Sequence, residues 1–177
     1  TLLCQSNQIS DLTPLDSRNL RELNCARNMI RSLDALRGFQ LERLACHGNG
    51  IESLEPLRGM PLKRLDAGMN PLDSIEPLHG LPLELLRLDA TPIESIAPLR
   101  DQPLALLSIA NCANIKDFSV LGSLLNLELI VVPDQTPQET LDSLQRQSPA
   151  IMIFNSDREG KYGDIENLLF RDAKQQR

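Results

Sequence analysis

The chain has 177 residues, a formal net charge of −6 and only 3% aromatic residues. An acidic chain with few aromatic side chains lacks the basic stripes and stacking platforms that nucleic-acid-binding proteins use. No apolar run approaches the roughly 20 residues that a membrane-spanning helix requires. We therefore expect neither a nucleic-acid partner nor insertion into a membrane.

A leucine recurs every 21 residues, and other positions recur with it. The repeating leucines are Leu2, Leu23, Leu44, Leu65, Leu86 and Leu107. Five residues after each leucine comes an asparagine in the first four units, then Thr91 and Cys112. A fixed short period is typical of a solenoid, in which each unit buries its apolar face against its neighbours. The pattern predicts an α/β fold: a right-handed solenoid with a parallel, concave sheet and short turns or 3-10 segments on the convex side.

One unit shows how the elements follow from the residues. Leu44 and Cys46 alternate with polar or small residues, which predicts a short strand with these two side chains inward. Asn49 follows where the chain leaves the strand, and stacked copies of it would form a hydrogen-bonded ladder between turns. Ser53 is placed to cap a single helical turn that Gly59 ends.

The 21-residue spacing is not kept after Leu107. The next predicted strand centres on residues 130–132, and a capping box at residues 136–139 predicts a helix through about residue 146. A last strand is expected at residues 150–154. We expect residues 1–154 to form a solenoid of about seven repeats that is truncated at its N-terminus. Residues 155–177 are expected to form a C-terminal capping segment or tail with a short helix.

The four cysteines occupy repeated positions. Cys4, Cys25 and Cys46 share one column of the repeat, and Cys112 lies in the asparagine column. Reduced core thiols are favoured over a disulfide between stacked neighbours, although adjacent strands lie within disulfide reach. No spacing typical of a metal site is present, so we expect no metal ligands. Unpaired cysteines favour a cytoplasmic location.

The repeated motif LxxLxCxxNxIxxLxPL resembles the leucine-rich repeats of bacterial proteins. Residues 7–15 resemble an internalin repeat. The middle repeats depart from that pattern, because Pro61, Pro82 and Pro103 precede the next strand. In this respect they are similar to the repeats appended to planctomycete-type serine/threonine kinases. The resemblance implies a leucine-rich repeat fold but no catalytic residue or cofactor, since the kinase motifs are missing from this chain.

Charged side chains are expected to gather on the outer, concave side of adjacent strands. The cluster comprises Glu22, Arg43, His47, Arg64, Asp66, Arg87 and Asp89. One interpretation is a recognition patch for an acidic or mixed-charge protein segment, with arginine as the anchor. The other is that polar residues merely cover and solubilise an exposed sheet. We expect His47 to be solvated rather than to bind a metal.

Two leucines interrupt this polar face. Leu85 and Leu106 occupy outward positions and are expected to be exposed. They fit a small hydrophobic docking spot, and equally a surface that the C-terminal segment covers.

The sequence therefore favours a noncatalytic protein–protein interaction module that binds an unidentified protein partner on its concave face. One alternative is the regulatory repeat region of a larger enzyme, such as a bacterial serine/threonine kinase whose catalytic domain lies outside this chain. Another is an adhesion-type repeat of a cell-surface protein.

Overall fold

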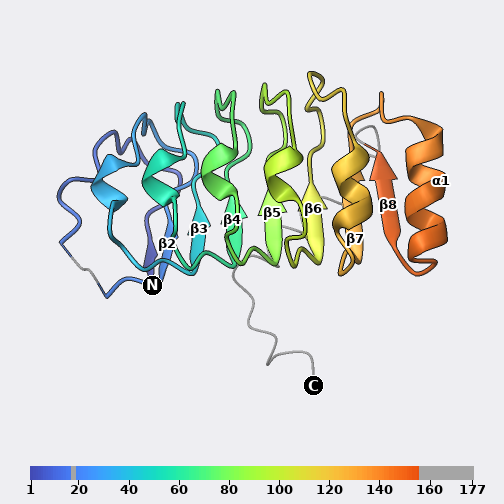
Figure 1. Cartoon of the computed structure of the whole chain (residues 1–177). Coiled ribbons are helices and arrows are strands. Elements are labelled where there is room, and N and C mark those ends of the chain that lie inside the picture. The colour runs from blue at the N-terminus through green and yellow to red at the C-terminus, as the bar shows by residue number, and fades with distance from the viewer. Residues whose placement is uncertain (17–18, 156–177) are drawn as a thin grey trace.

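Eight parallel strands stack into one sheet along the length of the molecule (Figure 1). The structure is a computed structural model that describes residues 1–16 and 19–155. Strands are neighbours in sheet order as they are in sequence. Their bounds are β1 (Leu2–Leu3), β2 (Glu22–Asn24), β3 (Arg43–Ala45), β4 (Arg64–Asp66), β5 (Leu85–Arg87), β6 (Leu106–Ser108), β7 (Leu129–Val132) and β8 (Met152–Asn155).

The register of the sheet follows the period of the sequence. Leu23 pairs with Leu44, and Leu44 with Leu65, so the repeating leucines lie side by side on adjacent strands. Their side chains point away from the concave face and are fully buried. Since parallel strands lie about 4.8 Å apart, each coil adds one such rung. The predicted parallel solenoid is confirmed.

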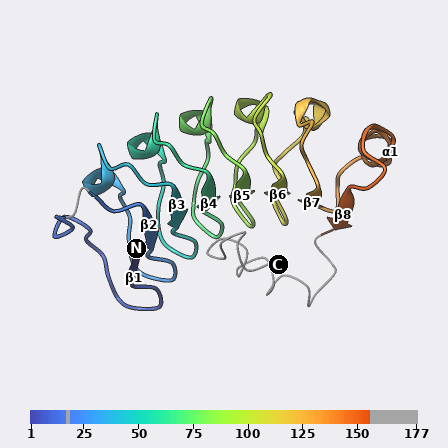
Figure 2. The ribbon, with the colours of Figure 1, turned by 90° about the horizontal axis from the view of Figure 1, so that it is seen from below.

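Short helical turns lie behind the sheet. The 3-10 turns are η1 (Asp34–Leu36), η2 (Glu55–Leu57), η3 (Glu76–Leu78), η4 (Ala97–Leu99) and η5 (Ser119–Ser123), followed by α1 (Gln138–Gln147). Seen from below, the molecule is an arc: the strands line its inner side and the helical turns line its outer side (Figure 2). The sheet is therefore concave, as expected from strands that pack more closely than the turns behind them.

A single apolar core runs through successive coils between the sheet and the turns. Each coil contributes its leucine or isoleucine side chains from the strand, the following loop and the helical turn. Phe39 is among the largest fully buried side chains, and the equivalent positions in the next coils hold Met60 and Leu81. The columns of the repeat therefore correspond to columns of the core.

The serine before each 3-10 turn was expected at the N-cap, but it lies one residue before the N-cap. Leu54, not Ser53, is the residue at the N-cap of η2. The hydroxyl of Ser53 nevertheless accepts a hydrogen bond from the backbone N–H of Glu55 at 3.2 Å. Gly59 ends the turn with a φ of +72°, as predicted.

A left-handed residue precedes the asparagine position in every coil from β1 to β6. The residues with positive φ there are Ser6, Arg27, Gly48, Met69, Ala90 and Asn111. In each of the first five coils the N–H of this residue donates to a carbonyl of the next coil, as Met69 N–H does to Asp89 O at 2.7 Å. Glycine is not required at this position, because five of these six residues carry a side chain.

At the C-terminal end the expected helix is present but its expected cap is not. Helix α1 follows Pro137 at the N-cap, with no side-chain cap. Thr136 is buried and its hydroxyl donates to Pro133 O at 2.7 Å, so the predicted capping box is wrong. Leu144 is buried and Leu141 partly so, as predicted. The helix expected within residues 155–177 lies outside the described residues, of which Asn155 is the last. No described helix is long and apolar enough to cross a membrane.

Candidate interaction surface

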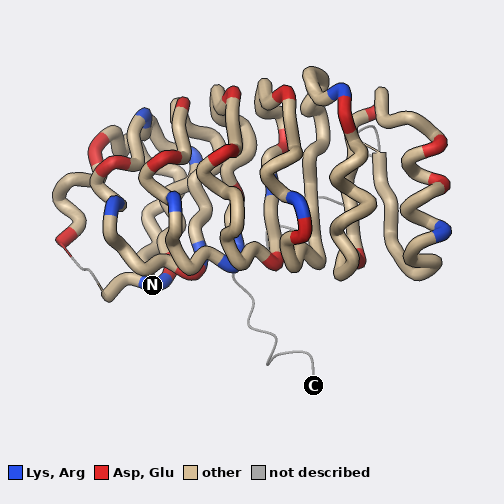
Figure 3. Tube along the Cα trace, in the orientation of Figure 1, with Lys and Arg blue, Asp and Glu red and all other residues tan. Residues whose placement is uncertain are grey.

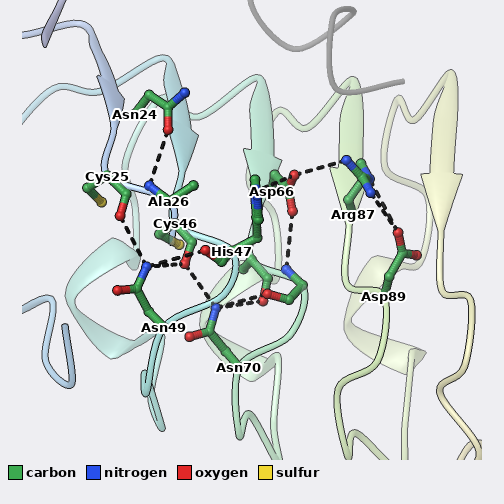
Figure 4. Close-up of polar contacts among 12 residues, drawn as sticks. Asn24, Cys25, Ala26, Cys46, His47, Asn49, Asp66, Asn70, Arg87 and Asp89 are labelled. Atoms are coloured by element: carbon green, nitrogen blue, oxygen red, sulfur yellow. Dashed lines mark hydrogen bonds and ion pairs between the residues drawn. The ribbon is translucent and has the colours of Figure 1, made fainter. Parts of the chain in front are cut away.

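The asparagine column forms a ladder that joins each coil to the one before it (Figure 4). The amide nitrogen of Asn49 donates to Cys46 O of its own coil at 2.9 Å and to Cys25 O of the preceding coil at 3.1 Å. Its amide oxygen accepts from the N–H of Ile30, also in the preceding coil, at 2.9 Å. Asn28 and Asn70 make the same set of bonds. The ladder is therefore structural, as the sequence predicted.

The ladder weakens along the chain because the side chain in its column changes. The hydroxyl of Thr91 donates to Leu88 O within its own coil at 2.7 Å. The thiol of Cys112 donates to Leu88 O of the coil before at 3.1 Å. A hydroxyl or thiol has a single donor hydrogen, whereas an amide nitrogen has two.

The strand register places the charged residues predicted for the site in three adjacent rows that cross the strands on the concave face. Glu22, Arg43 and Arg64 are paired in one row across β2, β3 and β4, and the same row continues into Leu85 and Leu106 on β5 and β6. A second row runs from Ala45 through Asp66 and Arg87 to Ser108. His47 and Asp89 belong to the third row. Each lies just past the end of its strand, toward the asparagine turn.

Arg87 forms an ionic network with the carboxylates of Asp66 and Asp89, and His47 lies beside it (Figure 4). Arg87 Nη1 lies 3.1 Å from Asp66 Oδ2, and Arg87 Nη2 lies 3.0 Å from Asp89 Oδ2. His47 Nδ1 lies 3.0 Å from Asp66 Oδ2, a contact that is an ion pair only when the imidazole is protonated. The side chains of Asp66 and Arg87 are 2% and 10% exposed. The expectation that His47 is solvated is wrong, because only 8% of the residue is exposed.

Backbone and hydroxyl donors complete the network. The N–H of Gly68 donates to Asp66 Oδ1 at 3.2 Å, and the N–H of Ala110 donates to Asp89 Oδ1 at 3.0 Å. The hydroxyl of Ser108 donates to the same Asp89 oxygen. These bonds hold both carboxylates in one orientation, because each oxygen has a fixed partner.

The row of Glu22, Arg43 and Arg64 is the more accessible part of the charged cluster. All three residues are half-buried. Arg43 Nη1 donates to Glu22 Oε1 across the strands, with side-chain exposures of 21% and 24%.

The ion pairs on the convex side have a different character. Arg58 pairs with Glu55 at 2.6 Å and Arg37 with Asp34 at 2.8 Å, each within one turn and each at least half exposed. Acidic and basic residues recur along these turns (Figure 3). The hydrogen bond from Arg58 lowers the pKa of Glu55. Exposed pairs of this kind stabilise a fold little and favour solubility.

The two outward leucines are buried. Leu85 and Leu106 are each 7% exposed, and with Ala110 and Val131 they form an apolar cluster separate from the main core. Leu129 and Phe154 pack against it. The expectation that Leu85 and Leu106 are exposed is therefore wrong.

All four cysteines are free thiols, and three of them are buried. Burial raises the pKa of the Cys25 thiol to about 12, and the neighbouring Cys4 thiol adds to this effect. Burial also raises the pKa of Cys46 well above its ordinary value. Neutral, buried thiols are poor nucleophiles and poor metal ligands.

Among residues 1–16 and 19–155, no three His, Cys, Asp or Glu side chains gather in a way that could hold a metal ion. An open depression of about 370 Å³ lies between η5 and α1, where it is lined by Leu121, Glu139 and Arg146 among others. A second, of about 510 Å³, lies beside Leu125 and Ser148. In the described part of the chain neither depression combines a nucleophile with histidine or cysteine.

Two structural residues were not anticipated from sequence. A Cβ at Gly68 would lie 3.0 Å from the backbone oxygen of Asp89, so this position admits glycine alone without a shift. A glycine two residues after the end of a strand is a signal that could have suggested such a close approach. Gln102 takes the buried position that Phe39, Met60 and Leu81 hold in other coils. Its Oε1 has no hydrogen-bond partner among the described residues.

Comparison with solved structures gives matches among bacterial leucine-rich-repeat proteins. Internalin C2 of Listeria monocytogenes is 28% identical, with a TM-score of 0.68, over 80% of this chain and 66% of the other. InlJ of the same organism, a functional domain described as including a cysteine ladder, is 24% identical with a TM-score of 0.66, over 86% and 33%. A leucine-rich-repeat protein of Leptospira interrogans is 21% identical with a TM-score of 0.56, over 82% and 40%.

The chain thus spans between 33% and 66% of these solved chains. No family model matches the sequence. No curated protein matches it either. The fold is that of a leucine-rich-repeat solenoid similar to the internalins, which confirms the fold predicted from the repeats. These structures do not bear on the resemblance to kinase-appended repeats, which stays a prediction.

Proposed function

We propose that this leucine-rich-repeat chain is a noncatalytic protein-binding module whose partner contacts the concave face at Glu22, Arg43 and Arg64. One observation carries the proposal: these half-buried charged side chains lie in register on three adjacent strands of a rigid sheet. Successive members are about 4.8 Å apart, because that is the spacing of strands.

The buried network beside this row supports the proposal. Asp66 and Arg87 form an ion pair in the neighbouring row. The row of Glu22, Arg43 and Arg64 therefore lies beside side chains that do not need to rearrange on binding. Preorganisation of this kind favours affinity, because little conformational freedom is lost when the partner docks. His47, Asp66, Arg87 and Asp89 therefore belong to the proposed site as its support.

The chemistry of the row indicates the class of partner. Two arginines and one glutamate suit a protein segment with acidic or mixed charge, since guanidinium groups bind carboxylates through paired hydrogen bonds. Leu3, 60% exposed on the same face at its N-terminal end, adds an apolar contact. The proposal therefore combines an ionic row with a small apolar edge.

Charge reversal tests this site directly. A partner is first isolated by affinity capture with the wild-type chain, and its Kd is then measured for wild type, Arg64→Glu and Arg58→Glu. Arg58 lies on the convex turn η2 and serves as the matched control. We expect Arg64→Glu to weaken binding about tenfold or more, the effect of losing one interface anchor, with Arg58→Glu unchanged.

An equal Kd for wild type and Arg64→Glu, with the same melting temperature, would reject the concave row as the binding site. The two alternative settings, a regulatory region of a larger enzyme and an adhesion-type repeat of a surface protein, are both compatible with binding on this face. The coding sequence that flanks this chain distinguishes between them.

A further inference from the structure

The ladder residue Asn49 is followed by Gly50, and this is the single Asn-Gly pair in the sequence. An asparagine side chain can react with the nitrogen of the next residue, and glycine shields that nitrogen least because it has no Cβ. The neighbours of the other ladder asparagines hinder or forbid the reaction. Met29 carries a side chain beside its nitrogen, and Pro71 has no N–H.

The backbone does not require glycine at position 50. Gly48 has a positive φ, but Gly50 does not. A Cβ at Gly50 would meet Arg31 Cγ at 3.4 Å and Ile30 O at 3.7 Å, which are van der Waals contacts. The equivalent positions of other coils hold Gln8, Met29, Pro71 and Pro92. The fold therefore accepts a side chain at this position.

In the folded chain one residue of the preceding coil holds both groups that would react. The N–H of Gly50 donates to Ile30 O at 2.9 Å, and the N–H of Ile30 donates to Asn49 Oδ1 at 2.9 Å. The amide nitrogen of Asn49 is bonded to Cys25 O and Cys46 O (Figure 4). The side chain of Asn49 cannot turn toward the nitrogen of Gly50 without breaking these bonds between the two coils.

We propose that Asn49 is a deamidation site that the fold holds closed, and that separation of its coil from the coil of Ile30 opens it. In the opened chain the nitrogen of Gly50 loses its proton and attacks Asn49 Cγ. The new N–C bond closes a succinimide ring, and Nδ2 leaves with that proton as ammonia. Water then opens the ring and leaves an aspartate or isoaspartate at position 49.

The product cannot restore the ladder bonds of Asn49. A carboxylate has no donor hydrogen, whereas Asn49 Nδ2 donates to carbonyls of two coils. The product also brings a negative charge to those carbonyl oxygens, and isoaspartate adds a methylene to the main chain. Separation of the two coils is reversible before the reaction. After it, the junction between them stays weakened, because a chemical change has followed the opening.

The inference does not rest on the proposed function, since it concerns this junction alone. The full chain would be incubated in mildly alkaline buffer, with and without guanidinium chloride. Peptide mass spectrometry then gives the deamidation rate at Asn49, with Asn28 of the same chain as the internal comparison. The variants are Gly50→Ala, which shields the nitrogen, and Leu33→Ala, which removes a buried side chain from the core of the preceding coil.

In guanidinium chloride we expect Asn49 to deamidate about tenfold faster than Asn28 or more, because only Asn49 precedes a glycine. In buffer its rate should fall by about a hundredfold or more, because the reaction waits for the coils to open. Leu33→Ala should raise the rate in buffer about tenfold and leave the rate in denaturant unchanged. Gly50→Ala should slow the reaction in denaturant about tenfold without lowering the melting temperature.

The effect of the product is measured separately. Asn49→Asp reproduces one of the two products and should lower the melting temperature by about 4 °C or more. Asn126→Asp makes the same change at an exposed position and serves as the matched control, whose melting temperature should stay near that of the wild type.

Each of three results would overturn the inference. Equal rates at Asn49 in buffer and in denaturant would show that the fold does not hold the site closed. Equal rates at Asn49 and Asn28 in denaturant would show that Gly50 does not direct the reaction. A melting temperature of Asn49→Asp equal to that of Asn126→Asp would show that the junction survives deamidation.

Discussion

Arg87 on β5 and Asp66 on β4 form an ion pair of 3.1 Å between neighbouring strands, with at most 10% of either side chain exposed. Arg87 also pairs with Asp89, so one guanidinium balances two carboxylates. Removing one partner from a buried pair leaves an uncompensated charge, which destabilises far more than the loss of an exposed pair.

Arg87→Met should therefore lower the free energy of unfolding by about 3–5 kcal/mol. Arg58→Met removes an exposed pair and should cost under about 1 kcal/mol. Urea unfolding followed by circular dichroism measures both values. Similar losses for the two variants would mean that the concave ion pairs stabilise the fold no more than exposed ones do.

Asn49→Ala should lower the free energy of unfolding by about 1–3 kcal/mol, because it leaves carbonyl and amide groups of two coils without partners. Arg43→Ala removes a partly exposed ion pair with Glu22 and should have a smaller effect. Thermal melts of the two variants give the order directly. If Arg43→Ala proved the more destabilising, the ladder would not have the structural role assigned to it.

The residue with positive φ before the asparagine position is glycine in one coil and alanine in another, which allows two opposite substitutions at equivalent places. Gly48 has a φ of +64° and Ala90 a φ of +53° in equivalent places. Ala90→Gly should raise the free energy of unfolding by about 0.5–1 kcal/mol, and Gly48→Ala should lower it by about 1 kcal/mol, because a Cβ is strained in this region. Chemical denaturation of both variants checks the two opposite signs, and effects of the same sign would contradict the assignment.

Gln102→Leu should stabilise the protein by about 1 kcal/mol. The change removes a buried Oε1 that has no partner among the described residues and restores the apolar side chain found in other coils. The Gln102 amide also donates to Leu78 O at 2.8 Å, but that carbonyl keeps its bond from Leu81 N–H. Differential scanning calorimetry is the measurement, and a lower melting temperature would show that the amide bonds outweigh the unpaired oxygen.

Stability should fall in alkaline solution. Burial raises the pKa of the Cys25 thiol to about 12, whereas a thiol in an unfolded chain ionises near about 8.5. Between these values the unfolded chain releases a proton that the folded chain keeps, so rising pH favours unfolding. Each such thiol should remove about 1 kcal/mol between pH 8.5 and 9.5.

Urea midpoints measured across this pH range give the slope, and Cys25→Ala should make it shallower. An unchanged slope in Cys25→Ala would show that other groups are responsible. Cys25 is suited to the test because it is fully buried in the main core.

The periodic features of the fold followed from the sequence, because the same physical demand recurs in every coil. Leu44 and Leu65 must both be inward, and Asn28 and Asn49 must both bridge two coils. The helix after Pro137 was also predicted in place, although its cap was not.

The features that were missed depend on what lies across the sheet or on the next coil. Alternation along β3 places His47 outward, but its contact with Asp66 on β4 accounts for its burial. The positive φ of Met69 accompanies a hydrogen bond to Asp89 O of the next coil, and the residue type gave no signal of it. Leu106 was assigned correctly to the outer face, yet it is buried there beside Leu85, Ala110 and Val131, which alternation along one strand cannot reveal.

The bonds of Asn28, Asn49 and Asn70 all cross a coil boundary with the same sequence offsets. Duplicating one 21-residue unit within this region would therefore reproduce every bond at the new junctions, whereas an insertion of another length would misalign them. Adding or removing a whole coil in this region thus keeps the hydrogen bonds of the asparagine ladder. The reach of its inner surface can be lengthened by gene duplication without redesigning the asparagine ladder.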